Sequence, residues 1–403
     1  MELFTLENGL KVCLKEREDL FSTTVVLWVK AGAAYETDRE RGAAHFLEHV
    51  IFTESENLAP GQIDAEVERL GGELNAATSY DYTYYYINLP GRYTLRALEL
   101  ISELVLRPVI SERAVEKERP IVLEEIARSR DNPHELFSER FLMELYRKAP
   151  YRHPILGYPD TVSSFTPELL QSFYNRLYTP ERMGLVVVGN FRPEEVKSRL
   201  SGLFCAEKKG EPVTEPEPEP ADTAAARFAL SHPTVSFPYV ALGWKLPPCG
   251  RHDIYFEILD SMLSSGRSAL LYRELRERGV VFSASSNYQN LLFGSNFTVS
   301  MATENPERAV EELKKLLKNL VERVSESEFQ LAKEKLKKGE LFGRESGEAE
   351  ADAIGYAVTV LGDPGYFTDF FKDLEAADIN TFREKISFLT EEPLIGLLTP
   401  QAD

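Results

Sequence analysis

Several features that mark other classes of protein are scarce in this chain. Its 403 residues include three cysteines, Cys13, Cys205 and Cys249, which are far apart and form no C-x-x-C pair. Neither a disulfide framework nor a thiolate zinc site is therefore expected. No apolar run reaches the length of about 18 residues that suggests a membrane-spanning helix, so no membrane partner is predicted.

Positive charge is also in short supply. The chain has 46 Lys and Arg against 65 Asp and Glu, a formal net charge of −19. Because nucleic-acid binding needs clustered Lys and Arg to neutralise phosphates, no nucleic-acid partner is expected. The first ten residues, MELFTLENGL, contain no basic segment followed by an apolar one. No signal peptide is therefore visible, and a cytoplasmic location is predicted if this is the native start.

Histidine is rare as well, with six in the chain, yet two of them fall within GAAHFLEHVIF. On a helix, His45 and His49 lie one turn apart and Glu48 lies about 60° to one side of His45. Two neutral imidazoles in this arrangement can hold Zn²⁺, and a neighbouring carboxylate can take a proton from a metal-activated water. The order H-x-x-E-H is the inverse of the commoner H-E-x-x-H. The alternative is a chance pairing on an amphipathic helix, which a third ligand would exclude.

Candidates for a third ligand occur in a predicted helix that starts near Ser111. Glu118 and Glu125 are seven residues apart and share one stripe of this helix, whereas Glu124 points about 100° away. Most acidic helix faces are merely solvated, and Pro120 between the two carboxylates is expected to kink the helix. The spacing alone therefore does not select a ligand.

Periodicity and turn signals predict alternating helices and strands in the first half of the chain. Asn8-Gly9 is a preferred two-residue hairpin turn, and Gly71-Gly72 marks a helix end. The predicted strands cover residues 23–30, 73–79, 83–89 and 183–190, and the predicted helices cover residues 42–52, 62–70 and 111–126.

The second half of the chain repeats the first. Residues 68–79 resemble residues 275–286, and matching Gly71 with Gly279 gives an offset of about 208. The strand after Tyr178 aligns with residues 389–397 at a nearly equal offset of 211. Two nearly equal offsets, found at distant positions of the chain, indicate a duplicated domain. The copy has no metal motif, because residues 255–260 read YFEILD.

Between the halves, residues 210–220 alternate Pro and Glu, a composition that we expect to be extended and unable to pack. The predicted division is an N-terminal zinc-binding domain at 1–208, a linker at 209–224 and a C-terminal domain at 225–403. The predicted fold class is α+β: two duplicated α/β domains, each a mixed, mostly antiparallel sheet packed against helices, joined as a clamshell.

These features together resemble the inverzincin peptidases, the pitrilysin, insulysin and mitochondrial processing peptidase family, in its small two-domain form. The resemblance covers essentially the whole chain and rests on LENGL, GAAHFLEH, GGELNA and the segment from Glu118 to Glu125. The family pairs H-x-x-E-H with a Glu about 76 residues further on. Counting from His49, this spacing selects Glu125 as the third ligand.

The resemblance implies further roles. Glu118 is expected to orient a metal ligand, and the strand through Asn75 and Ala76 to hold the substrate backbone by β-augmentation. Family members also place an Arg and a Tyr from the second half opposite the zinc. Here Arg276 is present, but Phe282 stands where the Tyr is expected. There are two interpretations of Phe282. Either a partner chain supplies the hydroxyl that Phe282 lacks, or Phe282 is a tolerated core aromatic.

The resulting functional prediction is a zinc endopeptidase with one Zn²⁺ per chain and Glu48 as general base, acting on peptides or unfolded segments. A dimer is expected, either a homodimer or a heterodimer with a zinc-less paralogue that carries the missing Tyr. The alternative is a non-catalytic peptide-binding or scaffold subunit of a related hetero-oligomer. Zinc content distinguishes the two predictions.

Overall fold

The computed structural model describes residues 1–205, 213–220, 226–250 and 253–401. The chain divides into two compact units, and each unit collects three segments of sequence. The first unit comprises Met1–Arg128, His153–Pro216 and Gly343–Phe367, and the second comprises Ser129–Arg152, Glu217–Phe342 and Thr368–Asp403.

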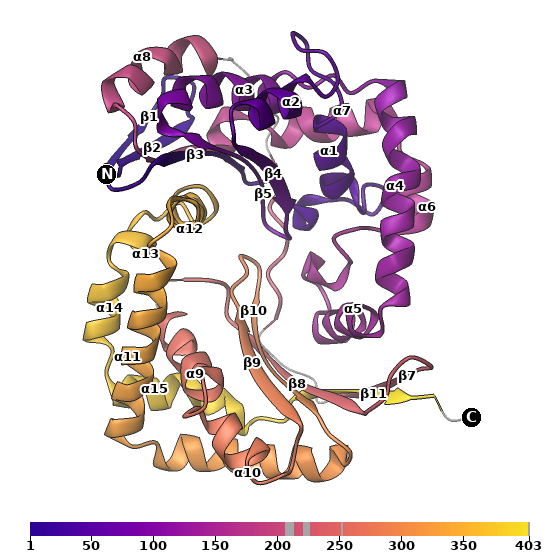
Figure 1. Ribbon diagram of the computed structural model, residues 1–403. Coiled ribbons are helices and arrows are strands. Elements are labelled where there is room, and N and C mark those ends of the chain that lie inside the picture. The colour runs from indigo at the N-terminus through magenta and orange to yellow at the C-terminus, as the bar shows by residue number, and fades with distance from the viewer. Residues whose placement is uncertain (206–212, 221–225, 251–252, 402–403) are drawn as a thin grey trace. The chain divides into compact units, whose positions relative to one another are not determined.

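The first unit is built on a six-stranded mixed sheet in the order β1-β2-β6-β3-β5-β4 (Figure 1). Strands β2 and β6 pair in parallel, and the other neighbours pair antiparallel. The strands are β1 (Glu2–Thr5), β2 (Lys11–Glu16), β3 (Ser22–Val29), β4 (Glu73–Thr78), β5 (Thr83–Pro90) and β6 (Met183–Gly189).

The sequence explains the placement of these strands. The predicted hairpin joins β1 to β2, and Gly9 adopts the positive φ of 94° that its tight turn requires. Strands β3 and β6 are almost wholly buried, as their apolar and β-branched residues suggest, and they occupy the middle of the sheet. Strand β4 is half exposed and ends the sheet.

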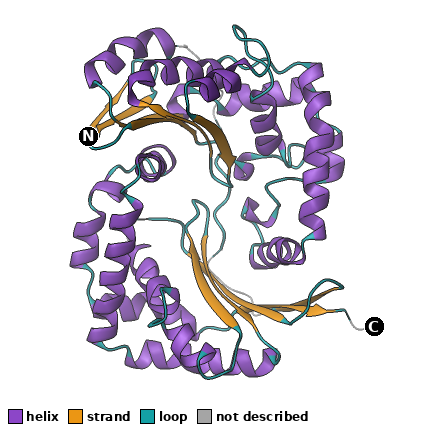
Figure 2. Ribbon diagram, in the orientation of Figure 1, coloured by secondary structure: helices purple, strands orange, loops and turns teal. Residues whose placement is uncertain are grey.

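Helices cover both faces of this sheet (Figure 2). Helix α3 (Thr94–Leu106) packs on β3 and β5, α1 (Ala43–Ile51) packs against β4, and α12 (Gly347–Gly355) packs on β3 and β6 from the other face. The remaining helices assigned mainly to this unit are α2 (Gln62–Arg69), α4 (Glu112–Asp131), α6 (Pro159–Ser163), α7 (Pro167–Leu177), α8 (Pro193–Leu203) and α13 (Gly365–Thr368).

The second unit contains a five-stranded sheet in the order β7-β11-β8-β10-β9. Its strands are β7 (Arg227–His232), β8 (Tyr239–Leu246), β9 (Ser283–Gln289), β10 (Ser295–Ala302) and β11 (Leu394–Pro400). Its helices are α5 (Pro133–Leu145), α9 (Ile254–Ser264), α10 (Pro306–Arg323), α11 (Glu326–Gly343), α14 (Phe370–Ala376) and α15 (Ile379–Lys385). Among the residues that the structure describes, no helix has both the length and the apolar character needed to cross a membrane.

The two sheets share one topology. Without β1, the order of the first sheet is β2-β6-β3-β5-β4, which corresponds strand by strand to β7-β11-β8-β10-β9. In each sheet the first pair is parallel, β2 with β6 and β7 with β11, and the other pairs are antiparallel. The predicted α+β fold with two related α/β units is therefore confirmed, as is the internal repeat. The exact domain ranges and the clamshell arrangement remain predictions.

Each unit also takes a helical segment from the other half of the chain. Helix α12 lies late in the sequence but belongs to the first unit, and α5 lies early but belongs to the second. Phe137 and Phe141 of α5 fill the space beside Gly396 and Gly243 of the second sheet, where a Cβ would come within 2.8 Å and 2.6 Å of their rings. This exchange is a feature that the linear repeat did not predict.

The Pro/Glu segment behaves only partly as expected. Its parts at 209–212 and 221–224 lie outside the described residues, and residues 213–220 form neither helix nor strand. The expectation that it cannot pack is wrong at Glu219, which is buried. Its carboxylate accepts hydrogen bonds from the backbone N–H groups of residues 147–149 and pairs with Lys245 at 2.9 Å. These donors replace the water that the carboxylate loses on burial.

Candidate metal centre

The candidate metal centre is carried by helix α1, whose first turn is fixed from upstream. Gly42 is the N-cap residue, with φ 97°, and because it is a glycine it offers no side chain to cap the helix. The two oxygens of the Glu36 carboxyl group accept hydrogen bonds from the N–H groups of Gly42 and Ala44, at 2.9 and 2.8 Å. Glu36 therefore satisfies two N–H groups at the helix start and holds the helix in place.

His45 and His49 meet Glu125 at one point. The Nε2 atoms of His45 and His49 lie 3.6 and 3.5 Å from Oε2 of Glu125. One possible ligand atom from each of the three residues lies within 4.8 Å of the others. Two imidazole nitrogens and one carboxylate oxygen are a donor set that zinc enzymes use, so these residues fit a zinc ion.

Glu125 comes from α4, which continues through Pro120 to Asp131. The predicted stripe is present, because Glu118 and Glu125 both approach the histidines. Glu124 is exposed and pairs with Arg128 at 2.5 Å, as its angular offset suggested.

Glu118 determines how His49 is turned. Its carboxylate is buried and lies 3.3 Å from Nδ1 of His49. With Nδ1 engaged, Nε2 is the nitrogen of His49 that remains for a metal. His45 also turns Nε2 toward Glu125, while its buried Nδ1 has no hydrogen-bond partner among the described residues.

Glu48 lies beside the three candidate ligands on α1, and Thr78 holds it there. The hydroxyl of Thr78, the last residue of β4, donates a hydrogen bond to Oε2 of Glu48. This contact was not predicted from the sequence. A lone Thr at a strand end carries no signal for it, because the contact depends on the approach of α1 to β4.

The electrostatics of these groups differ. Burial lowers the pKa of His45 to about 4, so this imidazole is neutral at pH 7 and can offer a lone pair. Burial also works to lower the pKa of His49, but hydrogen bonds to Glu125 and Glu118 outweigh it and raise that pKa. A hydrogen bond from His49 lowers the pKa of Glu125, and burial raises the pKa of Glu48. Glu125 is thus favoured as an anion, whereas Glu48 gains affinity for a proton.

The predicted substrate strand is the edge of the first sheet. Asn75 and Ala76 lie in β4, which pairs with β5 on one side and ends the sheet on the other. The side chain of Asn75 accepts a hydrogen bond from the N–H of Ala76 at 2.9 Å. Thr78 on the same strand contacts Glu48, so β4 leads directly to the candidate base.

Arg276 and Phe282 belong to the second unit. Arg276 ends the π-helical turn η6 (Tyr272–Arg276), lies over the Tyr272 ring at 5.0 Å and donates to the carbonyl of Phe282 at 3.1 Å. Phe282 does not lie in the core, because the residue is 47% exposed and touches Phe237 edge-on. That its missing hydroxyl is tolerated stays a prediction. An exposed ring at this position leaves room for the functional interpretation.

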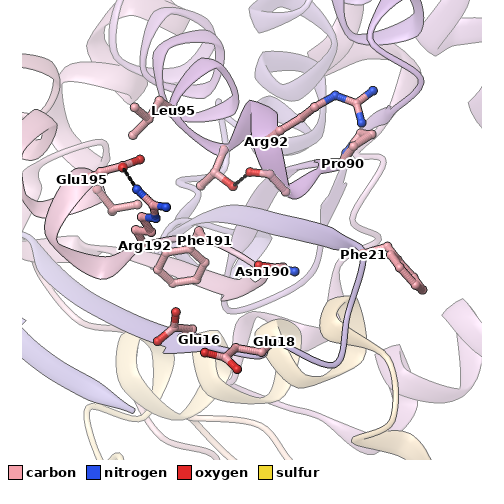
Figure 3. Close-up of a pocket in the computed structure, with 13 residues that line it drawn as sticks. Glu16, Glu18, Phe21, Pro90, Arg92, Leu95, Asn190, Phe191, Arg192 and Glu195 are labelled. Atoms are coloured by element: carbon pink, nitrogen blue, oxygen red, sulfur yellow. Dashed lines mark hydrogen bonds and ion pairs between the residues drawn. The ribbon is translucent and has the colours of Figure 1, made fainter.

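A separate cavity of about 750 Å³ lies at the other end of the first sheet (Figure 3). Strand β5 begins at Thr83, whose hydroxyl lies 3.4 Å from that of Thr78, and it ends at Pro90, which lines the cavity. The cavity is polar, and an ion pair between Arg192 and Glu195 crosses part of it. It shares no residue with the metal centre.

An H-x-x-E-H helix beside the edge strand of a mixed sheet, with a glutamate from a second helix, defines a metallopeptidase of the inverted-motif class. The sequence matches the family described as Insulinase (Peptidase family M16) over residues 11–158 and the Peptidase M16 inactive domain over residues 164–336.

Individual proteins agree with this class. An uncharacterized zinc protease of Mycobacterium tuberculosis is 31% identical, covering 87% of this chain and 82% of that protein. One from Rickettsia felis is 28% identical over 97% of this chain and 96% of its own length. The crystal structure of a protease from Helicobacter pylori superimposes with a TM-score of 0.92 at 26% identity, covering 99% of both chains. The chain belongs to the insulinase family of peptidases, as the sequence motifs predicted.

Proposed function

We propose that this protein is a zinc-dependent endopeptidase that hydrolyses peptides or unfolded segments. One observation carries the proposal: His45, His49 and Glu125 converge on one point while Thr78 holds Glu48 beside them. Three protein ligands and a nearby carboxylate that does not belong to the ligand group are the pattern of a catalytic rather than a structural zinc site.

The ligands proposed for one Zn²⁺ per chain are Nε2 of His45, Nε2 of His49 and the carboxylate of Glu125. When bound, zinc supplies a Lewis acid that acidifies water and polarises a carbonyl group. Glu48 accepts the proton as the water attacks the peptide bond and later delivers it to the leaving amine. Its raised pKa suits both roles, since a base with a pKa closer to 7 holds and releases a proton more readily.

Strand β4 is the proposed binding site for the substrate backbone. A sheet edge can pair with an extended peptide through main-chain hydrogen bonds, and Asn75 and Ala76 lie on this edge. Because Thr78 of the same strand holds Glu48, a peptide aligned on β4 is also aligned with the base. This link supports a preference for extended, unfolded substrates.

The second unit is proposed to contribute Arg276, which the resemblance assigns to stabilisation of the oxyanion or of the substrate backbone. A dimer is proposed on the same basis: either a homodimer or a heterodimer whose zinc-less partner supplies the Tyr that Phe282 replaces. The proposed location is cytoplasmic.

The function is tested by hydrolysis of a quenched fluorescent peptide library, with zinc measured in the same samples. We expect turnover by the wild type and a loss of about 10²–10⁴-fold in Glu48→Gln at unchanged zinc content, the range for removal of a general base. Glu124→Gln, an exposed neighbour of the metal centre, serves as the matched control. Turnover that survives in Glu48→Gln would show that Glu48 is not the base.

A further inference from the structure

A second cavity lies in the first unit, between the sheet and helix α12, and nothing in the proposed chemistry uses it. Its volume is about 390 Å³. The sheet contributes Val26, Tyr84 and Tyr86, and the chain around α12 contributes Ser346, Glu348, Ala349 and Asp352. Val26 pairs with Tyr86 across neighbouring strands, so the sheet residues share one face.

The carboxylates of the cavity lack a counter-charge. Glu348 and Asp352 are four residues apart on α12 and therefore lie on one face of the helix. Neither forms an ion pair with any described residue, and like charges at this spacing destabilise a helix. Glu348 lies in the first turn, where the helix dipole favours a negative charge, but Asp352 lies beyond it. Helix stability thus does not account for Asp352.

The neighbouring acid on α12 behaves differently. Glu350 is buried and pairs with Lys15 and Arg17, which anchors the helix to the C-terminal end of β2. Lys15 and Arg17 are thus engaged by Glu350, whereas the solvent-exposed carboxylates of Glu348 and Asp352 are available to a ligand. Removal of water by the surrounding protein, together with the charge of Glu348, raises the pKa of Asp352 to about 6. A bound cation would relieve both effects.

The opposite wall of the cavity is aromatic. Trp28 stacks on Tyr84 with ring centroids 4.8 Å apart, and Tyr84 continues to Tyr86 at 6.3 Å. The hydroxyl of Tyr86 donates to Glu73 at 2.9 Å, which adds a third carboxylate near this wall. Aromatic rings facing carboxylates attract a cation through both the ring quadrupole and the negative charge.

The cavity is close to the proposed substrate strand. Tyr86 pairs with Asn75 of β4 and Tyr84 pairs with Ala77, so the cavity lies on the face of the sheet that these two residues share. Thr78, which holds Glu48, points to the other face because successive residues of a strand alternate. An extended peptide added to β4 would direct every second side chain toward the cavity face.

The distance from a peptide paired with β4 to the cavity determines which peptide side chains could reach it. Strands are spaced by about 4.8 Å, so the backbone of an added peptide would run about 10 Å from β5. A long side chain with a charged end can extend across β4 while keeping its aliphatic stem against the sheet. Lys and Arg side chains have this length, and their positive charge would pair with the carboxylates of Glu348 and Asp352.

We propose that the cavity between β5 and α12 is a specificity subsite for a Lys or Arg side chain of a peptide bound along β4. The proposal rests on the proposed peptidase function and names its substrate class: peptides with a basic residue whose side chain points to the cavity face.

The experiment compares two extended peptides that differ only in one residue, Arg or its uncharged analogue citrulline, placed in turn at each position. Binding is measured by fluorescence anisotropy to the full chain carrying Glu48→Gln, which makes the result independent of turnover. We expect the Arg peptide to bind about tenfold more tightly at one alternating set of positions. Asp352→Asn together with Glu348→Gln should reduce this ratio to about one.

Glu68→Gln, which removes one exposed charge of α2 outside the cavity, is the control and should keep the ratio. The subsite would be overturned if the Glu48→Gln protein bound the Arg and citrulline peptides equally. It would also be overturned if the cavity substitutions left the preference for Arg unchanged. If the Glu48→Gln protein binds the Arg peptide about tenfold more tightly than the citrulline peptide but the wild type cleaves neither, the peptidase function fails while the subsite stands. If neither peptide binds, both the subsite and the β4 binding mode are wrong.

Discussion

At the scale of single residues, the orientation of His49 depends on a carboxylate that is not itself placed among the ligands. Glu118 lies 3.3 Å from Nδ1 of His49 and leaves Nε2 directed at Glu125. A carboxylate in this position fixes the ring and makes the nitrogen on its other side a better ligand. The contribution of Glu118 is therefore measurable as metal affinity.

We expect Glu118→Gln to weaken zinc binding about 10–100-fold, the range for loss of such a partner. Competition with a fluorescent zinc chelator measures the affinity. Glu124→Gln on the same helix removes an exposed charge and should leave it unchanged. Equal zinc affinity in Glu118→Gln and the wild type would contradict the positioning role of Glu118.

A second residue-scale prediction concerns Glu219, whose buried carboxylate pairs with the equally buried Lys245. Glu219→Gln would leave the Lys245 ammonium without its counter-charge and should lower the free energy of unfolding by about 3–5 kcal/mol. Glu217→Gln breaks only the exposed pair with Lys148 and should cost about 0–1 kcal/mol. Urea denaturation of both variants makes the comparison.

The same carboxylate has a defined pH dependence. Burial works to raise the pKa of Glu219, but the N–H groups of residues 147–149 and the Lys245 ammonium outweigh it and hold the pKa below its ordinary value. A lowered folded-state pKa stabilises the protein above the unfolded pKa of about 4.3, and this stabilisation is lost as pH falls through the folded value. The stability gap between wild type and Glu219→Gln should thus be full at pH 7 and smaller at pH 3. If the difference in unfolding free energy between the wild type and Glu219→Gln were larger at pH 3 than at pH 7, the lowered pKa of Glu219 would be contradicted.

How far single residues can be predicted from the sequence depends on how local their signal is. His45, Glu48 and His49 share one helical face and could be recognised from spacing alone. Glu125 could not, because a solvated acidic face has the same pattern; the family spacing selected it. Thr78 and Glu219 act through contacts between segments distant in the chain, which no local pattern encodes.

At the scale of elements, helix α1 is held at its start by a side chain six residues upstream. Glu36 uses both carboxyl oxygens, one for the N–H of Gly42 and one for that of Ala44. Glutamine has a single oxygen, so Glu36→Gln would leave one buried N–H without an acceptor. Such a loss typically costs about 1–3 kcal/mol.

We therefore expect Glu36→Gln to lower the free energy of unfolding by that amount and to weaken zinc binding, because His45 lies in the turn that Glu36 fixes. Asp38→Asn is the control in the same loop, since the Asp38 side chain is 94% exposed. Thermal unfolding with and without zinc measures both effects. Should Glu36→Gln match Asp38→Asn in each respect, Glu36 would have no role at the helix start.

The elements themselves were largely predictable where a periodic pattern met a turn signal. The hairpin at Asn8-Gly9 and the strands β3, β4, β5 and β6 lie where apolar patterning and turn residues placed them. Pro120 lies inside α4, and the helix continues through it to Asp131. The exchange of α5 and α12 between units was not predicted, because amphipathicity indicates that a helix packs but not on which sheet.

At the scale of the whole molecule, the topology is duplicated, but the residues that the structure describes form one candidate metal centre. The two sheets share their strand order, but the helix that follows β8 has no H-x-x-E-H motif. The second unit instead carries Arg276 and the exposed Phe282. The proposed dimer with a divided active site rests on two features: the first unit carries all three candidate zinc ligands, and the second has Phe282 where the family resemblance expects a Tyr.

Phe282→Tyr tests this division in the isolated chain. We expect the restored hydroxyl to raise peptide turnover by up to about 10²–10³-fold if it supplies a missing oxyanion donor. Native mass spectrometry of the untagged protein measures the oligomeric state and identifies any second chain. High turnover by an isolated monomer, unchanged in Phe282→Tyr, would contradict the divided site.

Zinc content per chain measures whether His45, His49 and Glu125 form a zinc site. Elemental analysis after gel filtration should give one zinc per chain for the wild type and for Glu124→Gln, and far less than one for Glu125→Gln. Wild-type protein that binds no zinc, or Glu125→Gln that retains a full equivalent, would show that these three residues do not form a zinc site.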